Sequence, residues 1–479
     1  MNATDRLPPL APETAEREMR AAFERMHAAS RAEPPAPRAR REAALDALTA
    51  LVHGNVDRIA AAISTDFGHR SAHETWGLEV FPSLEACRHA RRHVGRWMKP
   101  KRRPVSIWFQ PGRARIIPQP LGVIGIIVPW NYPLLLAIAP ISAALAAGNR
   151  VMVKMSELTP RTGELLAELA AHHFPNGELT VVLGDAAIGA QFARLPFDHL
   201  LFTGSTRVGH EIMRMAAENL TPVTLELGGK SPAIIAPDFP LAKAAERIMF
   251  GKAVNAGQTC IAPDYVLLPK GKAEEFAERA AAAARRFYPR LSANSDYATI
   301  INQKQFDRLT AWLDEARAAG ARILPLGEGA SDPARRLFVP VVLIGAPDVT
   351  HVMREEIFGP LLPLVEYETL DDAIAYVNAR PRPLALYLFD RDSGTISHVL
   401  ARTLAGGVTV NDTLLHIAQD DLPFGGIGPS GMGAYHGEEG FRAFSHMKPV
   451  FIQARFNAAG LLSPPFGRMR RALIRLLLR

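Results

Sequence analysis

Cysteine is scarce in this chain of 479 residues, which contains only Cys87 and Cys260. Two cysteines cannot hold a fold of this size together by disulfide bonds, and they leave little room for a structural zinc site. This composition favours a reducing, cytoplasmic compartment, in which any functional cysteine acts alone. Because 48% of the residues are hydrophobic, a disordered chain is excluded, and the length predicts about three structural units.

Acidic residues are missing from two short segments. Residues 91–103 carry seven basic side chains, and residues 468–479 carry five. The two segments together hold more charge than the formal net charge of +7, so the rest of the chain is mildly acidic. Aromatic residues are not interleaved with these basic side chains, apart from Trp97, and we therefore expect no nucleic-acid partner. We also expect no secretory leader, because residues 1–14 contain charges and no apolar run.

Charged residues are absent from residues 116–149, and hydropathy alone would allow a membrane span there. The segment contains five prolines, however, and no continuous helix passes through them. It is better explained as a buried strand at 122–128, a turn at 129–133 and a buried helix at 134–147 that Gly148 ends.

The same alternation of strand and helix continues along the chain, which predicts βαβ units and parallel sheets. A mostly helical region with a proline-rich loop at 33–37 precedes it. Further strands are predicted at 150–154, 179–183, 199–203, 222–227, 233–236 and 265–268, and near 322–325 and 340–344, with helices at 159–173, 206–219, 241–252, 272–288 and 370–379. We therefore expect an α/β protein with two α/β domains.

Ligands of such sheets bind at the carboxyl ends of the strands, so polar and glycine residues at these ends are candidates for a binding site. Residues 202–209 (FTGSTRVG) join a strand to a helix whose N-terminus Ser205 and Thr206 can cap. This segment is neither a G-x-G-x-x-G motif nor a P-loop. Taken alone it favours an ordinary capped helix, with a phosphate site as the alternative.

Three other residues at strand and helix ends are candidates for catalysis. Cys260 lies in a glycine-containing loop between a helix and a strand, a setting for a thiolate nucleophile; the alternative is a packed thiol, as expected for Cys87. Glu226 ends an apolar strand, where desolvation would tune it as a general base, or it pairs with Lys230. Asn131 can donate to an oxyanion or bond to turn backbone.

Taken together, the blocks at 129–133, 202–209, 226–232 and 257–260 resemble, in order and spacing, those of the NAD(P)-dependent aldehyde dehydrogenase superfamily. The blocks at 154–157 (KMSE), 356–360 (EIFGP) and 422–426 (LPFGG) agree, and the resemblance extends over residues 19–450. Residues 260–265 and 431–446 resemble the branch that contains the class 3 and fatty aldehyde dehydrogenases, and within it the bacterial coniferyl aldehyde dehydrogenases most. This resemblance implies an aromatic aldehyde such as coniferaldehyde, or a medium- or long-chain aliphatic one, as the substrate.

This resemblance implies a role for each candidate. Cys260 would attack the aldehyde, Asn131 and the Cys260 backbone N–H would hold the oxyanion, and Glu226 would activate the water that hydrolyses the thioester. No metal is implied. The cofactor would be NAD, with NADP also possible: Glu157 favours NAD, whereas Met155 replaces the family's usual proline. The implied cofactor-binding residues are Trp130, Lys154, Glu157, Gly204, Ser205, Gly209, Leu227, Glu356 and Phe358.

The sequence leaves two alternatives to a hydrolytic enzyme. One is a CoA-acylating aldehyde dehydrogenase of the same fold. The other is a noncatalytic protein that binds a membrane or a polyanion through its basic segments.

The resemblance also implies an aldehyde dehydrogenase-like fold, with two doubly wound α/β domains, and a homodimer. A Rossmann-type cofactor domain would comprise residues 1–103 and 122–229, a catalytic domain residues 230–445, and an oligomerisation arm residues 104–121 and 446–458. Residues 459–479 would form a basic amphipathic tail, too short to span a bilayer, which takes about 20 residues. Docking of this helix on the protein or its dimer partner is favoured over contact with a membrane surface.

Overall fold

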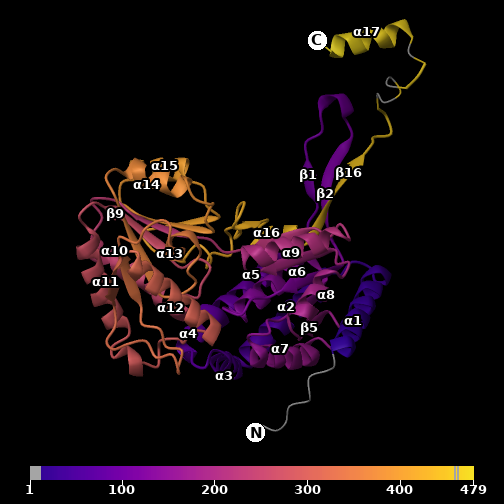
Figure 1. Cartoon of the computed structure of the whole chain (residues 1–479). Coiled ribbons are helices and arrows are strands. Elements are labelled where there is room, and N and C mark those ends of the chain that lie inside the picture. The colour runs from indigo at the N-terminus through magenta and orange to yellow at the C-terminus, as the bar shows by residue number, and fades with distance from the viewer. Residues whose placement is uncertain (1–11, 458–459, 461–462, 466, 479) are drawn as a thin grey trace.

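The computed structural model of the chain describes residues 12–457, 460, 463–465 and 467–478. Residues 1–11 of the predicted cofactor domain, and residues 458–459, 461–462, 466 and 479 at the other end, therefore lie outside the described residues. Two parallel sheets covered by helices form the body of the protein, and a narrow three-stranded arm projects from it (Figure 1). The predicted α/β fold with two sheet-containing units is confirmed.

Helices build the N-terminal region up to Trp97, and residues 33–37 form the predicted break between the first two. The elements are α1 (Pro12–Ala32), α2 (Arg38–His53), α3 (Val56–Phe67), α4 (Ala72–Thr75), the π-helix η1 (Trp76–Val80) and α5 (Phe81–Trp97). Leu45, Leu48 and Val52 recur at helical spacing and are fully buried, because this face of α2 packs against α5 and α6 (Leu135–Ala147).

The first sheet has six strands in the order β15-β7-β6-β3-β4-β5, all parallel except β15. The chain runs outward from β3 to β5 and returns to β6 on the other side of β3. The carboxyl ends of β3 and β6 thus form a topological switch point, where such sheets bind ligands. The strands are β3 (Val123–Ile127), β4 (Arg150–Lys154), β5 (Leu179–Val182), β6 (His199–Thr203), β7 (Val223–Glu226) and β15 (Gly431–Met432), and the connecting helices are α6 (Leu135–Ala147), α7 (Pro160–His173), α8 (Ala186–Ala193) and α9 (Thr206–Ala217).

The second sheet has seven strands in the order β10-β11-β12-β9-β8-β13-β14, with β10 antiparallel at one edge. Its central strands are buried at nearly every position, as expected for a sheet covered on both faces. The strands are β8 (Pro232–Ile235), β9 (Tyr265–Pro269), β10 (Arg322–Pro325), β11 (Val341–Ile344), β12 (Leu361–Tyr367), β13 (Ala385–Phe389) and β14 (Gly407–Val410). The helices are α10 (Leu241–Ala253), η3 (Val254–Gly257), α11 (Ala273–Phe287), η4 (Leu291–Ala293), α12 (Gln303–Ala318), α13 (His351–Arg354), α14 (Leu370–Asn378) and α15 (Ser393–Arg402).

The arm is an antiparallel sheet of β1 (Lys101–Arg103), β2 (Arg113–Pro120) and β16 (Ser445–Ile452), with the short helix η2 (Ile107–Phe109) between β1 and β2. Strand pairing differs from the predicted division of the chain at two places. β1 lies within residues assigned to the cofactor domain but pairs with the arm. β15 lies within the predicted catalytic domain but pairs with β7, and α16 (Gly437–Ala443) packs on α5 and α6. The domain division itself stays a prediction.

The predicted C-terminal helix is present as α17 (Arg468–Leu477). Figure 1 shows it beyond the arm, away from both sheets. The sequence of this helix predicts an apolar face of Met469, Ala472, Leu473, Leu476 and Leu477 and a basic face of Arg471, Arg475 and Arg479. Arg479 and the side chains of Leu473 and Leu477 lie outside the described residues. Within the described ranges, the helices are all too short or too polar to cross a membrane.

Candidate active site

A cavity of about 230 Å³ lies between the carboxyl-end loops of the first sheet and segments of the second unit. Loops that follow three neighbouring strands of the first sheet form one wall of the cavity. Segments of the second unit, which is the part of the chain built around the second sheet, form the other wall. The loops after β3, β6 and β7 contribute Pro129, Trp130, Asn131, Thr203, Gly204, Ser205, Glu226, Leu227 and Gly228, and the second unit contributes Cys260, Gln305, Arg308, Glu356 and Phe358.

Most of the residues singled out in the sequence meet in this cavity, and three do not line it. Gly209 lies in α9 and contacts Leu227, which lines the cavity. A Cβ at Gly209 would be 2.7 Å from Cδ2 of Leu227, so glycine allows α9 to pack against that side chain. Lys154 ends β4, further along the same sheet edge, and its Nζ donates to the carbonyls of Met155 and Gly184 at 2.7 Å each. Glu157 is exposed. The ribose-binding role of Lys154 and Glu157 stays a prediction.

The loop before Cys260 has an unusual backbone. Asn255 and Ala256 have φ angles of 51° and 50°, in the left-handed region that residues with a Cβ avoid, and Gly257 follows with 74°. Glycine is required at 257 by space as well, because a Cβ would be 2.4 Å from the Gly359 carbonyl oxygen. Such strain persists only where surrounding contacts fix it.

Those contacts come from a buried polar network around Arg70. Its side chain is fully buried, with Nη1 donating to Glu79 Oε1 at 2.6 Å and Nε to Glu74 Oε1 at 3.2 Å. Glu74 accepts the backbone N–H of Asn255 at 2.9 Å, and Arg70 Nη1 donates to the Asn131 carbonyl at 3.3 Å. Glu79 Oε2 accepts the N–H of Leu134 at 2.7 Å, at the start of α6. One guanidinium therefore ties together the loops of two candidate residues.

Asn131 makes the backbone hydrogen bond that was one of its two expected roles, and donation to an oxyanion stays a prediction. It is buried, and its Nδ2 donates to the Gln258 carbonyl at 3.2 Å, two residues before Cys260. An amide has two N–H groups, so one remains for a ligand in the cavity. The Asn255 side chain holds the Asn131 carbonyl at 3.0 Å, which fixes the orientation of the loop.

Glu226 lies at the end of β7 with both carboxylate oxygens buried and without a hydrogen-bond partner among the described residues. Burial raises the pKa of this carboxyl well above its ordinary value, as its position in the sequence predicts. Pairing with Lys230, the alternative, is wrong: Lys230 bonds to Asp264 and to the carbonyls of Val352 and Glu355. Burial thus favours the protonated form of Glu226, which becomes a base only after it has lost its proton.

Cys260 is half-buried, and Cys87 is fully buried in α5, as expected for a packing thiol. Burial, and then the charges of Glu356 and Glu226, raise the pKa of the Cys260 thiol to about 12. The thiol form therefore dominates at neutral pH, and a thiolate forms only when a proton is removed on reaction or as pH rises.

Glu356 belongs to a loop that Asp264 fixes from behind, because Asp264 Oδ1 accepts the N–H of Ile357 at 3.0 Å. Burial, followed by the charge of Asp264, raises the Glu356 pKa to about 8. Gly228 must be glycine, since a Cβ would be 1.9 Å from Glu356 Oε2. Phe358 next in the loop has a φ of 47° and packs edge-on against Trp130, with ring centroids 5.3 Å apart.

Sequence reasoning missed three groups of the site. Gln305 and Arg308, one turn apart on α12, both line the cavity, and Arg308 Nη2 donates to the Ile357 carbonyl at 2.7 Å. Their spacing of three on a helix was the available signal. Burial, and then the charges of Glu226 and Cys260, raise the pKa of Tyr435, so its side chain lies close to both groups. Arg70 gave no local signal, because its partners are distant in sequence.

The cavity suits a dinucleotide at one end. Oε1 of Glu356 and Oγ1 of Thr203 are buried without partners among the described residues, so they can bond hydroxyl groups of a ligand. Ser205 caps α9, accepting the Val208 N–H, and places the positive end of that helix at the cavity. No group of three or more His, Cys, Asp or Glu side chains able to hold a metal occurs in the described part of the chain.

Comparison with known proteins identifies the family. The model of the aldehyde dehydrogenase family matches residues 9–450. The chain belongs to the aldehyde dehydrogenase family. A probable coniferyl aldehyde dehydrogenase of Pseudomonas aeruginosa is 54% identical over 458 residues, 95% of each chain. A coniferyl aldehyde dehydrogenase of another Pseudomonas strain is 46% identical over 461 residues, also 95% of each. The substrate-bound structure of Staphylococcus aureus AldH superposes with a TM-score of 0.91 at 35% identity, covering 96% of this chain and 99% of that one.

This aldehyde dehydrogenase therefore catalyses NAD(P)-dependent aldehyde oxidation, and the resemblance stated from the motifs is confirmed. The noncatalytic alternative is wrong. The choice between NAD and NADP is not decided by family membership.

The Arg70 network generates a first prediction. Replacing Arg70 with Met leaves the buried carboxylates of Glu74 and Glu79 without their cation, which should lower the free energy of unfolding by about 3–5 kcal/mol. Urea denaturation followed by fluorescence measures this change. Arg58→Met, at an exposed arginine that pairs with Glu168, is the matched control and should change stability little. Equal stability of the two variants would contradict a structural role for the network.

The raised pKa of Cys260 generates a second prediction. Alkylation of the cofactor-free enzyme by iodoacetamide should accelerate continuously from pH 6 to about 10, because the thiolate fraction rises about tenfold per pH unit below the pKa. Glu356→Gln removes a negative charge near the thiol, lowers its pKa and should speed alkylation several-fold at pH 8. Mass spectrometry of the Cys260 peptide gives the rate.

The control for this measurement is Glu368→Gln, which alters an exposed carboxylate that pairs with Lys270. Its alkylation rate should equal that of the unmodified enzyme. Slower or unchanged alkylation in Glu356→Gln would mean that this carboxylate does not face the thiol.

Proposed function

We propose that this aldehyde dehydrogenase oxidises an aromatic aldehyde, coniferaldehyde being the representative, to its carboxylic acid with Cys260 as nucleophile. The single observation that carries the chemistry is the meeting of Cys260, Asn131 and the unpaired carboxyl of Glu226 in one cavity. The aromatic substrate is supported by the two relatives that carry the coniferyl name. Medium- and long-chain aliphatic aldehydes are the competing substrate class.

In the proposed reaction, Cys260 Sγ forms a bond to the aldehyde carbon, the thiol proton passes to a water molecule, and the electron pair of the carbonyl π bond moves to its oxygen. The resulting oxyanion accepts hydrogen bonds from the second N–H of Asn131 Nδ2 and from the Cys260 backbone N–H. A nicotinamide cofactor bound in the cavity supplies the hydride acceptor. Because the Gln258 carbonyl already holds one N–H of Asn131, the amide is oriented before the substrate arrives.

Release of the acid requires water, and Glu226 is the group we assign to activate it. Its raised pKa makes it a stronger base than an ordinary carboxylate once deprotonated, and no side chain among the described residues competes for its oxygens. This supports hydrolysis over transfer of the acyl group to CoA, since a base at this position is needed only when water is the acceptor.

The cofactor assignment extends along the sheet edge. We assign Glu356 to the nicotinamide ribose, with Phe358 and Trp130 packing beside it, and Gly204, Ser205, Gly209 and Leu227 to the segment that receives the pyrophosphate. Lys154 and Glu157 would bind the adenosine ribose. The exposed carboxylate of Glu157 favours NAD, because it can accept a 2′-hydroxyl and would repel a 2′-phosphate.

We also infer that the chain is a homodimer. Ile107, Trp108 and Phe109 on the projecting arm are exposed, with Ile107 at 77% and Trp108 at 65%, and apolar groups in such a position favour contact with a second copy. The α17 helix beyond the arm would then pack on the partner subunit in preference to a membrane surface.

Glu226 provides the test of the hydrolytic step. Glu226→Gln should retain a burst of NADH equal to one per Cys260 but lower steady-state turnover by about 10²–10⁴-fold, because the thioester is no longer hydrolysed. Stopped-flow absorbance gives the burst, and intact-protein mass spectrometry detects the acyl adduct. Glu218→Gln, on the exposed end of α9, is the control. Normal turnover of Glu226→Gln at neutral pH would refute the base assignment.

The substrate class is tested by kcat/KM for coniferaldehyde and benzaldehyde against hexanal and longer alkanals, each with NAD and with NADP. We expect kcat/KM to be about tenfold or more higher for the aromatic aldehydes, a discrimination that a single apolar pocket can provide. We also expect kcat/KM to be higher with NAD than with NADP. A preference for long alkanals would reject the aromatic assignment while leaving the chemistry intact. Formation of acyl-CoA instead of free acid, when CoA is added, would reject hydrolysis.

A further inference from the structure

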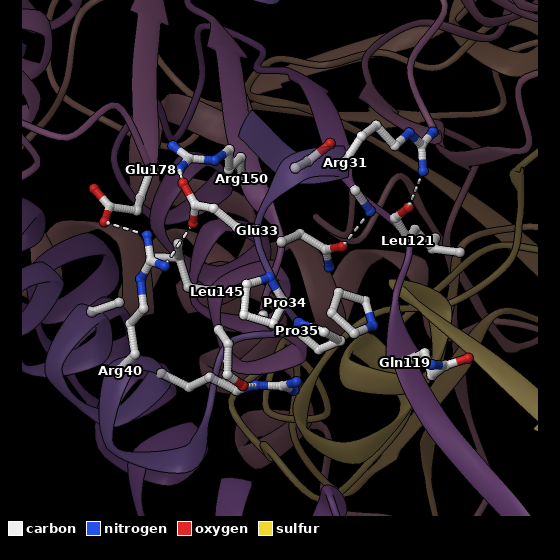
Figure 2. A pocket seen from close by; sticks show the side chains of 18 of the residues that line it. Arg31, Glu33, Pro34, Pro35, Arg40, Gln119, Leu121, Leu145, Arg150 and Glu178 are labelled. Carbon is white, nitrogen blue, oxygen red and sulfur yellow. Dashed lines mark hydrogen bonds and ion pairs between the residues drawn. The ribbon is translucent and has the colours of Figure 1, made fainter. Parts of the chain in front are cut away.

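A second cavity of about 250 Å³ lies at the base of the arm and shares no lining residue with the first. The proline-rich loop between α1 and α2 forms one side of it. The end of α6, the start of β4 and the base of the arm strands β2 and β16 form the others. Figure 2 shows Arg40, Arg150 and Glu178 on one side of this cavity, Arg31 and Leu121 on the other, and Pro34 and Pro35 between them. We call it the arginine cavity.

Three of its four arginines are paired with carboxylates. Arg40 donates to Glu33 at 2.7 Å and to Glu178 at 3.3 Å, and Arg150 donates to the other oxygen of Glu33 at 2.7 Å. Arg31 pairs with Asp198 at 2.6 Å. Their charges are therefore compensated within the protein.

Arg41 is the exception. Its side chain is buried, with the whole residue only 4% exposed, yet its hydrogen bonds go to two backbone carbonyls: Nε to Ala36 at 2.9 Å and Nη1 to Ala146 at 3.1 Å. Nη2 has no hydrogen-bond partner, and the guanidinium no carboxylate partner, among the described residues. Burial without a counter-charge lowers its pKa to about 10.

The position of this guanidinium is fixed by Gly148. Gly148 ends α6 with a φ of 89°, and a Cβ there would be 2.7 Å from Arg41 Cζ, so the charged group lies directly against a bare backbone. A buried charge is costly unless an opposite charge and hydrogen bonds compensate it. The described chain does not supply that charge, whereas the cavity leaves Nη2 open to a ligand.

We propose that the arginine cavity binds a small organic carboxylate, whose oxygens bond to Arg41 and whose apolar body packs against Pro34, Pro35 and Leu121. Guanidinium groups match carboxylates in geometry and charge. The apolar part of the wall, completed by Pro120 and Leu145, suits an amphiphilic anion better than a fully hydrated one. An organic carboxylate is also the class of product that an aldehyde dehydrogenase forms.

Calorimetric titration with trans-cinnamate tests this proposal on the full-length enzyme after iodoacetamide has blocked Cys260. We expect one site per chain, with affinity at least tenfold weaker in Arg41→Gln. Because Arg41 also bonds two carbonyls, a second variant is needed: Ala36→Phe fills the cavity from the loop and leaves the guanidinium in place. It should weaken binding to the same extent. Thermal denaturation checks that both variants are folded.

Arg38→Gln is the matched control, since Arg38 is on the same helix, is exposed, pairs with Glu42 and does not line the cavity. It should bind cinnamate as the unmodified enzyme does. Cinnamamide, which has the same shape without the charge, should not bind. Equal affinity for cinnamamide, or unchanged cinnamate binding in both Arg41→Gln and Ala36→Phe, would overturn the proposal. Binding of inorganic phosphate but not of cinnamate would also overturn it, because the ligand would then be an inorganic oxyanion.

Discussion

The buried ion network of Arg70, Glu74 and Glu79 is the constraint on which the rest of the active site depends. Through Glu74 the network holds the backbone N–H of Asn255, a residue with a positive φ angle in the loop that leads to Cys260. Glu79 holds the start of α6. Removal of one partner would leave a buried charge unpaired, so the network is held in place, and its contacts to Asn131 and Asn255 connect the two walls of the cavity.

Desolvation between the two units then sets the chemistry. Cys260, Glu226 and Glu356 all have raised pKa values, and in each case burial is the largest cause. Since the three acidic groups share one cavity, ionisation of one opposes ionisation of the others. Burial thus favours the protonated forms of all three groups, and each must lose its proton before a thiolate or carboxylate is present in the cavity.

Local patterns were sufficient for most of the strands and helices of the first sheet and for marking the candidate residues at their ends, whereas several elements of the second sheet, such as α12 and β12, were not predicted. The apolar strands and their capped helices are predictable because each is dictated by neighbours in sequence, and Glu226 stands out because a carboxylate ends an apolar strand. The partners of these residues are not predictable in this way. Lys230 is four residues from Glu226 but bonds to Asp264, because β8 and β9 are adjacent in the sheet. Gln305 and Arg308 reach the cavity from a helix that the sequence does not connect to it.

The sequence by itself determined an α/β fold, because strands and helices follow from local hydrophobicity and spacing. It also marked Cys260, Glu226 and Asn131 as candidates, and the resemblance of its motif blocks to a known family implied their roles. Only the tertiary structure decided which charges are compensated. Arg40 is paired with two carboxylates while its neighbour Arg41 bonds only to backbone carbonyls, for a reason that lies in three-dimensional packing. Compensation of a buried charge depends on segments far apart in the chain, which meet only when both sheets have formed.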